Sequence, residues 1–224
     1  MTPIVLVHGG MNSSLAWVPV LPYLEAQALA IDLPGRGKNP ADLATVTLDD
    51  AVATVLKEAD AAGFDRFVLV GHSLGGVTIT ETAYRHPERI ASLVYVGALI
   101  PGPGQTAAGL MGVPPLEAMP VLAADTAKAL FSTGLTDEQW DEHYAELVPD
   151  APALMNSTVS GYPLATPATY LSMTDDQPVP PALARQMVTN LPQVDFRTID
   201  EGGHTLMITR PQLLAGILNE IAAG

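Results

Sequence analysis

The sequence Gly71-His72-Ser73-Leu74-Gly75-Gly76 separates two stretches of different character. Before it, residues 66–70 form a short run rich in β-forming apolar side chains, with the length of a buried strand. After it, residues 77–83 have the length and spacing of a helix. The stretch therefore predicts a sharp turn from a strand into a helix, with a serine at the tip of the turn.

The two glycines beside Ser73 fit that turn sterically. Side chains at Gly71 and Gly75 would collide across it, and the turn forces the serine into a strained backbone conformation. This geometry lifts the Ser73 hydroxyl clear of the sheet, at the positive end of the following helix. A Gly-x-Ser-x-Gly motif between a strand and a helix is typical of a nucleophile elbow. The competing interpretation is a serine–glycine turn without chemistry.

Strands and helices alternate over the first part of the chain. Continuous apolar runs predict buried strands at residues 4–7, 28–31, 67–70 and 91–96. Between them, helices are expected at residues 14–27, from an N-cap at Thr47 to Gly63, and from the turn at Ser73 to about residue 86. This alternation is typical of a doubly wound parallel sheet, which binds ligands at the carboxyl ends of its strands.

The pattern changes from about residue 101 to 167. Prolines and glycines interrupt this segment, which contains two expected helices, at 123–131 and 136–147, and no strand. The sheet then resumes, with strands expected at 169–173 and 194–199 and helices at 182–190 and 210–223. We therefore expect one domain over residues 1–224, with a core at 1–100 and 168–224 and a mainly helical cap insertion at about 101–167.

A serine nucleophile needs a base, and the base needs a carboxylate that orients it. Of the five histidines, His204 follows a late strand and lies in a glycine-rich loop that can reach Ser73. The loop after residue 173 offers Asp175 and Asp176, and Pro180, four residues after Asp176, favours Asp176. Asp175 stays open as an alternative. The chain order serine, acid, histidine is that of Ser-His-Asp hydrolases with a nucleophile elbow.

Two backbone N–H groups are expected to stabilise the developing negative charge. One should belong to Leu74, directly after the nucleophile, and the other to Gly10 or its neighbour Met11, after the first strand. The predicted substrate contacts are Met11, His72, Trp140 and Tyr144. For each aromatic residue of the cap, packing of the cap onto the core is the competing interpretation.

The composition limits the classes of partner. Hydrophobic residues make up 48% and charged residues 15% of the chain, so a large core is available. The net charge is −14, with ten lysines and arginines scattered along the sequence, which argues against nucleic acid or an anionic membrane as a partner. We expect a small-molecule ester as the partner. Nothing in the sequence decides between a monomer and a homodimer.

Cofactors and targeting signals are not indicated. Cysteine is absent, and no metal-ligand spacing, dinucleotide fingerprint or phosphate-binding loop occurs, so we expect no metal and no cofactor. The N-terminus runs directly into a strand without a charged or long apolar leader, and no apolar run has the length of a membrane span. These features favour a cytoplasmic protein.

The motifs resemble those of the α/β-hydrolases over nearly the whole chain. More narrowly, the chain is similar to the branch that holds plant methyl-ester esterases and hydroxynitrile lyases. The matching stretches are residues 5–10, Trp17 with 21–25, 30–35, 69–76, 174–176 with Pro180, and 202–204. The resemblance implies an α/β-hydrolase fold with a mostly parallel sheet, Ser73 as nucleophile, Asp176 as acid and His204 as base. It also implies oxyanion donors at Gly10 and Leu74.

Two positions depart from the lyases of this branch. Those lyases carry Thr or Asn directly after the first-loop histidine, where this chain has Gly9, and related lyases carry Lys after the catalytic histidine, where it has Thr205. We therefore expect a serine hydrolase of the esterase type, which cleaves a carboxylic ester or lactone through an acyl-enzyme. The alternatives are a hydroxynitrile lyase, a cofactor-free perhydrolase and a non-catalytic binder with a hydrolase fold.

Overall fold

A single six-stranded sheet organises the chain. The computed structural model describes all residues 1–224, and the strand order is β2-β1-β3-β4-β5-β6. The strands are β1 (Ile4–Val7), β2 (Ala28–Ile31), β3 (Phe67–His72), β4 (Ile90–Val96), β5 (Ala168–Met173) and β6 (Val194–Ile199). Every neighbouring pair is parallel. The expected sheet is therefore confirmed, and it is fully rather than mostly parallel.

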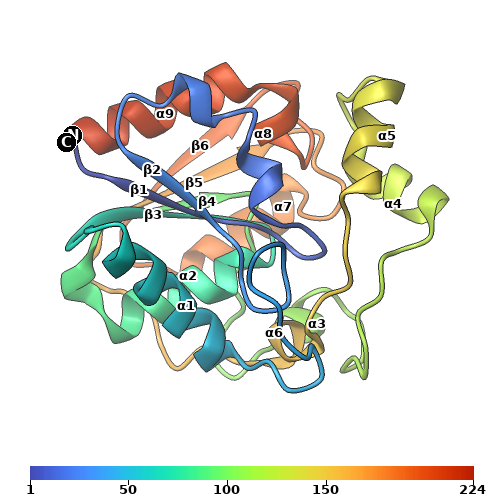
Figure 1. Ribbon diagram of the computed structural model, residues 1–224, viewed down its shortest axis with the longest axis horizontal. Helices are drawn as coiled ribbons and strands as arrows, with labels where there is room; N and C mark the ends of the chain where they lie inside the picture. The colour runs from blue at the N-terminus through green and yellow to red at the C-terminus, as the bar shows by residue number, and fades with distance from the viewer.

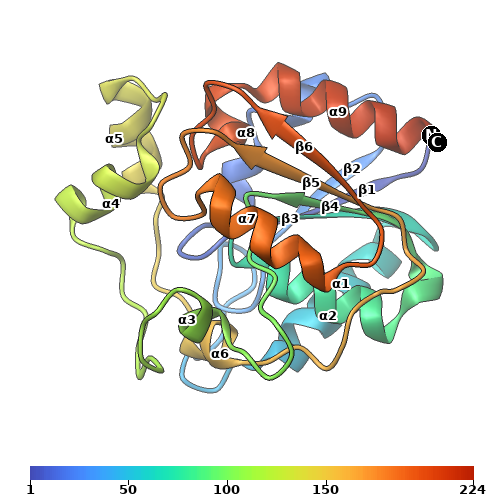
Figure 2. The same ribbon diagram turned by 180° about the vertical axis from the view of Figure 1, so that it is seen from behind.

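Helices cover both faces of the sheet (Figures 1 and 2). The layers are built from α1 (Leu48–Ala61), α2 (Gly75–Arg85) and α7 (Pro181–Met187) on one face, and α8 (Leu206–Thr209) and α9 (Pro211–Ala223) on the other. Strand residues alternate between the two layers: Val5 and Val7 belong to the first core, and Ile4 and Leu6 to the second. All four are fully buried, which explains why these strands read as continuous apolar runs.

The expected helix at residues 14–27 is not formed. Two short 3-10 turns occupy this region instead, η1 (Ser14–Trp17) and η2 (Leu21–Tyr23). Trp17 and Leu21 still pack on the second core as an amphipathic helix would, but Pro19 and Pro22 remove the N–H groups that a continuous helix needs. The expected N-cap at Thr47 is confirmed, since its side chain accepts the Asp50 N–H in a capping box.

The segment from 101 to 167 contains no strand of the sheet. Its helices lie beyond the carboxyl ends of the strands (Figure 1), and residues 157–167 return along α2, where Ser160 bonds to Glu81, to the start of β5. The segment holds α3 (Ala107–Leu110), α4 (Ala124–Phe131), α5 (Asp137–Ala145) and α6 (Pro152–Asn156), of which α4 and α5 are the two helices that the sequence predicts. In Figure 1, α4 and α5 form one group, α3 and α6 a second, and both termini lie at the opposite end of the molecule. None of the helices is long and apolar enough to cross a membrane.

Candidate active site

The turn between β3 and α2 has the geometry that its sequence predicts. Ser73 has φ 50°, a left-handed conformation that a residue with a side chain rarely adopts. A Cβ atom on Gly71 would lie 3.0 Å from the Gly75 carbonyl oxygen, and one on Gly75 would lie 2.6 Å from the His8 carbonyl oxygen. Side chains at the two glycines would therefore break the turn, and the backbone itself holds Ser73 in place.

His204 is paired with Asp176 and not with Asp175. Its Nδ1 lies 3.0 and 2.9 Å from the two Asp176 carboxylate oxygens, and both side chains are buried. The carboxylate also accepts the Val179 N–H at 2.8 Å. Asp175 is exposed. Because Nδ1 faces a carboxylate, the proton belongs there, and Nε2 is left as the acceptor.

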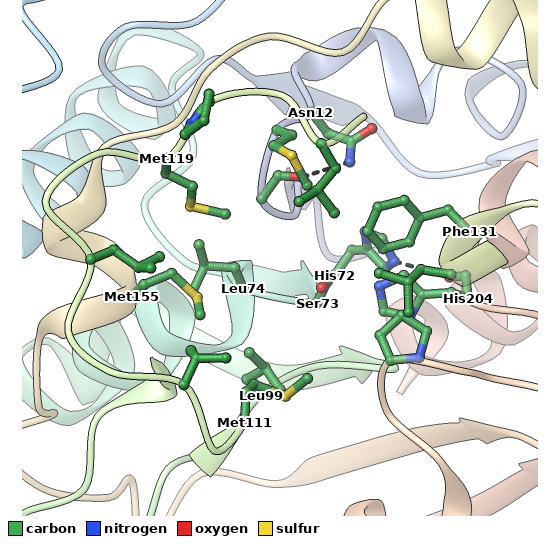
Figure 3. A pocket seen from close by; sticks show the side chains of 18 of the residues that line it. Asn12, His72, Ser73, Leu74, Leu99, Met111, Met119, Phe131, Met155 and His204 are labelled. Atoms are coloured by element: carbon green, nitrogen blue, oxygen red, sulfur yellow. Dashed lines mark hydrogen bonds between the residues drawn. The ribbon is translucent and has the colours of Figure 1, made fainter. Parts of the chain in front are cut away.

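Ser73 and His204 line the same cavity, which lies between the core and the cap and has a volume of about 360 Å³. Twelve of its 21 lining residues are hydrophobic, which makes it an apolar pocket with a few polar groups. Figure 3 shows Ser73 and His204 on one side and methionines opposite them. The labelled lining residues are Asn12, His72, Ser73, Leu74, Leu99, Met111, Met119, Phe131, Met155 and His204. Ser73 Oγ makes no hydrogen bond within the protein, so the hydroxyl is free to meet a ligand.

The two predicted oxyanion donors, Gly10 and Leu74, both line the cavity, and neither N–H group donates to an acceptor of the protein. The rival donor, the Met11 N–H, is occupied, because it donates to Asp150 Oδ2 at 2.9 Å. Met11 has φ 59°, a second left-handed residue beside the cavity. Of the two donors left open by the sequence, Gly10 is thus the one with a free N–H group.

Of the four predicted substrate contacts, Met11 and His72 line the cavity, while Trp140 and Tyr144 do not. The Trp140 ring is buried and lies 5.4 Å from the Tyr144 ring, and the Tyr144 hydroxyl donates to the Leu122 carbonyl at 3.0 Å. Both aromatic residues therefore hold the cap together, which corrects that expectation. The spacing of Trp140 and Tyr144 in α5 predicts that they share one face of the helix, but not whether this face points to the cavity.

Two other cap residues lie near His204 and are not singled out by the sequence. Phe131, the last residue of α4, stacks on His204 with ring centroids 5.6 Å apart. His143 lines the cavity, and its Nδ1 is buried without a hydrogen-bond partner. The sequence shows only that each residue lies in an expected helix. Whether its side chain reaches His204 depends on how the cap packs on the core.

Three buried histidines besides His204 surround the site as neutral rings. Burial lowers the pKa of His8 to about 4, against the raising effect of its hydrogen bond to the Gly9 carbonyl. Burial and the neighbouring His204 lower the pKa of His143 to about 4. The same two causes place the pKa of His72 well below its usual value. His72 Nε2 lies 3.0 Å from the His204 carbonyl oxygen, so the neutral ring donates a hydrogen bond that holds the loop of His204.

Similarity to known proteins agrees with this geometry. The sequence pattern of the alpha/beta hydrolase family matches residues 4–217, so the chain belongs to that family. A pyrethroid hydrolase from Sphingobium wenxiniae is 26% identical over an alignment that covers 99% of this chain and 88% of the relative. Methylesterase 7 from Arabidopsis thaliana is 28% identical, with 97% of this chain and 95% of the relative covered.

Solved structures show the same fold. The crystal structure of a pyrethroid hydrolase from Sphingobium faniae superposes with a TM-score of 0.85 at 24% identity, and covers 100% of this chain and 98% of that one. At this identity the match establishes the α/β-hydrolase fold. No group of three or more His, Cys, Asp or Glu side chains in this chain lies close enough together to hold a metal ion.

Proposed function

We propose that this protein is a serine hydrolase that cleaves carboxylic esters or lactones through an acyl-enzyme intermediate. One observation carries the proposal: His204, which is paired with Asp176, and the strained Ser73 line one cavity, beside two N–H groups without acceptors. The names of the full-length relatives, which are a pyrethroid hydrolase and methylesterases, support the class of carboxylic ester hydrolases.

In the acylation step, His204 Nε2 removes the proton of the Ser73 hydroxyl while Oγ attacks the ester carbonyl carbon. The carbonyl oxygen becomes an anion that accepts the N–H groups of Gly10 and Leu74. Asp176 stabilises the imidazolium that forms. When the tetrahedral intermediate collapses, the C–O bond to the alcohol breaks and His204 gives its proton to the leaving alkoxide.

In the deacylation step, His204 removes a proton from water, and the resulting hydroxide attacks the acyl carbon bound to Ser73. The same two N–H groups hold the second oxyanion. Collapse breaks the bond to Ser73 Oγ, which takes its proton back from His204, and the carboxylic acid leaves. A lactone follows the same steps and gives a hydroxy acid, because alcohol and acid belong to one molecule.

The lining indicates apolar substituents on the substrate. The cap contributes Met111, Val113, Leu116, Met119, Leu122 and Leu130, whose side chains offer no charge to bind. A substrate gains affinity here by burying hydrocarbon, at roughly 25 cal/mol per Å² of apolar surface. We infer esters with apolar acyl or alcohol groups that fit about 360 Å³.

The structure opposes the lyase alternative at Gly9. A Cβ atom there would lie 2.7 Å from His72 Nδ1 and 2.9 Å from Ser73 Cβ, so the polar side chain found in lyases of the branch has no room. At the second departure, Thr205 is buried and its hydroxyl donates to the Phe131 carbonyl at 3.2 Å. It therefore stabilises the cap and offers no charge for a departing cyanide.

The test is hydrolysis of p-nitrophenyl acetate and butyrate by the wild type and by Ser73→Ala. We expect turnover in the wild type and a loss of about 10³-fold or more in the variant, because the nucleophile is gone. A fluorophosphonate should add one phosphonyl group to the wild type at Ser73. Full activity of the variant would contradict the proposal. Negligible turnover of the wild type would favour a binder, and cleavage of mandelonitrile without esterase activity would favour a lyase.

A further inference from the structure

A buried ion pair joins the cap to the core beside the cavity. The guanidinium Nη2 of Arg36, in the loop after β2, contacts Oδ1 of Asp150, which lies between α5 and α6 of the cap, and both side chains are completely or almost completely buried. Arg36 makes no other salt bridge, and its Nε has no hydrogen-bond partner. Asp150 is therefore the charge that neutralises Arg36, and the mechanism described above uses neither residue.

The same carboxylate holds the loop that carries the oxyanion donor. Asp150 Oδ2 accepts the Met11 N–H at 2.9 Å, and the Met11 carbonyl accepts the Val148 N–H at 2.9 Å. Both polar groups of the Met11 backbone are thus bound to the cap segment between α5 and α6, and Met11 has a left-handed conformation there. This two-point clamp at Met11 leaves the preceding N–H, that of Gly10, without a protein acceptor and next to the cavity.

The carboxylate also lies close to Gly10, since a Cβ atom on this residue would be 3.5 Å from Asp150 Oδ2. A bare, buried carboxylate so near Gly10 would repel an oxyanion that the Gly10 N–H holds. The Arg36 guanidinium cancels that charge, while the second carboxylate oxygen stays available to Met11.

We propose that Asp150 and Arg36 are positioning residues for ester hydrolysis. Asp150 turns the Gly10 N–H toward the substrate by binding the N–H of Met11, and Arg36 keeps the carboxylate from opposing the oxyanion. This inference rests on the proposed function and deepens it. The oxyanion hole is complete only when the cap packs on the core and Asp150 reaches Met11. The two residues act through the backbone and touch no reacting atom.

The test compares two double variants that both remove the charges. In Arg36→Met/Asp150→Asn, the new amide side chain keeps an oxygen for the Met11 N–H. In Arg36→Met/Asp150→Leu, a side chain of similar size replaces the carboxylate with no acceptor. We expect the first variant to keep kcat for p-nitrophenyl butyrate within about fivefold of the wild type, and the second to lose about 10- to 100-fold in kcat with KM nearly unchanged.

Thermal unfolding of both double variants separates positioning from folding. A buried ion pair replaced by apolar groups often leaves stability unchanged or improved. A purely structural role therefore predicts normal kcat for any well-folded variant, and equal kcat in the two folded double variants would overturn the proposal. The single variant Arg36→Met, which leaves an unneutralised carboxylate, should be the least active of the three if it folds, and adding Asp150→Asn should restore kcat.

Two further readouts keep this proposal separate from that of the serine hydrolase. Both double variants retain Ser73 and should still be labelled by a fluorophosphonate. A trifluoromethyl ketone, whose adduct with Ser73 carries an oxyanion, should bind the double variant with Asp150→Leu about 10- to 100-fold more weakly than the one with Asp150→Asn. Equal inhibition of the two would contradict the clamp even if Ser73→Ala is inactive as expected.

Discussion

The core and the cap line one cavity but hold their residues by different means. Ser73 and Gly10 follow strands β3 and β1, whose backbones are hydrogen-bonded to parallel neighbours on both sides. The cap has no such frame. Contacts between side chains and backbone hold its segments together, as where the Asn156 amide both donates to the Leu116 carbonyl and accepts the Leu116 N–H.

This difference assigns different tasks to the two regions. Positions fixed by a parallel sheet can meet the tolerance of a few tenths of an ångström that chemistry requires, whereas apolar side chains on short helices can be exchanged without disturbing the frame. We therefore expect changes in the core to reduce turnover and changes in the cap to shift selectivity. The Asp150–Arg36 pair is the proposed exception, because Asp150 belongs to the cap and its loss should reduce turnover.

The largest effect is expected for Asp176→Asn in the core. Both carboxylate oxygens of Asp176 can accept the His204 Nδ1–H, whereas Asn has only one acceptor oxygen. Its NH2 group can instead donate to Nδ1, which favours the wrong tautomer of the ring, so kcat should fall about 10³- to 10⁴-fold. The adjacent Asp175→Asn is the matched control, since Asp175 is exposed, and it should stay within about twofold of the wild type. Steady-state hydrolysis of p-nitrophenyl butyrate measures both. A loss confined to Asp175→Asn would reverse the assignment of the acid.

A single added carbon in the core should also have a large effect. Gly9→Ala places a Cβ against His72 Nδ1 and Ser73 Cβ, which must move apart, and a displacement of about 1 Å at the nucleophile costs about 10²-fold in kcat. Gly216→Ala in α9 is the control, because a Cβ there meets no atom within 4 Å. It should leave kcat unchanged. Similar kcat values for both variants would mean that the frame around Ser73 is more tolerant than the sheet geometry implies.

The sheet can be predicted because its strands and the turn at Ser73 depend on residue types that are neighbours in the sequence. Strands buried on both faces are continuous apolar runs, and the Gly-x-Ser-x-Gly turn requires small residues at fixed positions, so β3, Ser73 and the helix after it can be located from residue types alone. The spacing of Trp17 and Leu21 is misleading, because an apolar stripe does not show whether prolines leave the helix intact. The choice between Asp175 and Asp176 needs the tertiary structure, which shows the side chain that meets His204.

The cap can be predicted only as a segment. Its helix α5 begins with a capping box at Thr136, but α3 and α6 are four and five residues long and too short for a periodic pattern. Trp140 is expected at the substrate and instead packs within the cap, since one apolar face can serve either purpose. Arg36 and Asp150 give no signal, because an ion pair between distant positions leaves no periodic trace in the sequence.

A moderate effect is expected in the cap for Met111→Ala, which removes one side chain from the wall of the cavity (Figure 3). The added space should raise kcat/KM for octanoate relative to butyrate esters by about 5- to 10-fold, while kcat for acetate changes less than about threefold. Leu164→Ala, also in the cap but 68% exposed and away from the cavity, is the control and should not change the ratio. A fall in kcat for all chain lengths would instead place Met111 among the residues that position the reaction.

The smallest effect concerns stability, and it involves buried histidines from both regions. Burial lowers the pKa of His8 in the core and of His143 in the cap to about 4, against 6.5 in the unfolded chain. Between these two values the unfolded chain binds protons that the folded chain does not, so the free energy of unfolding falls as the pH falls. Well above pH 6.5 the rings are neutral in both states, and these residues no longer affect the pH dependence.

From pH 7.0 to 5.5 each of these histidines should lower the free energy of unfolding by about 1 kcal/mol. His143→Gln removes one of these two rings from the folded and the unfolded chain. Urea unfolding at both pH values should show a decrease that is smaller by about 1 kcal/mol for His143→Gln than for the wild type. Equal decreases in the two proteins would mean that the cap admits water to His143, and that the cap is looser at this point than the core around His8.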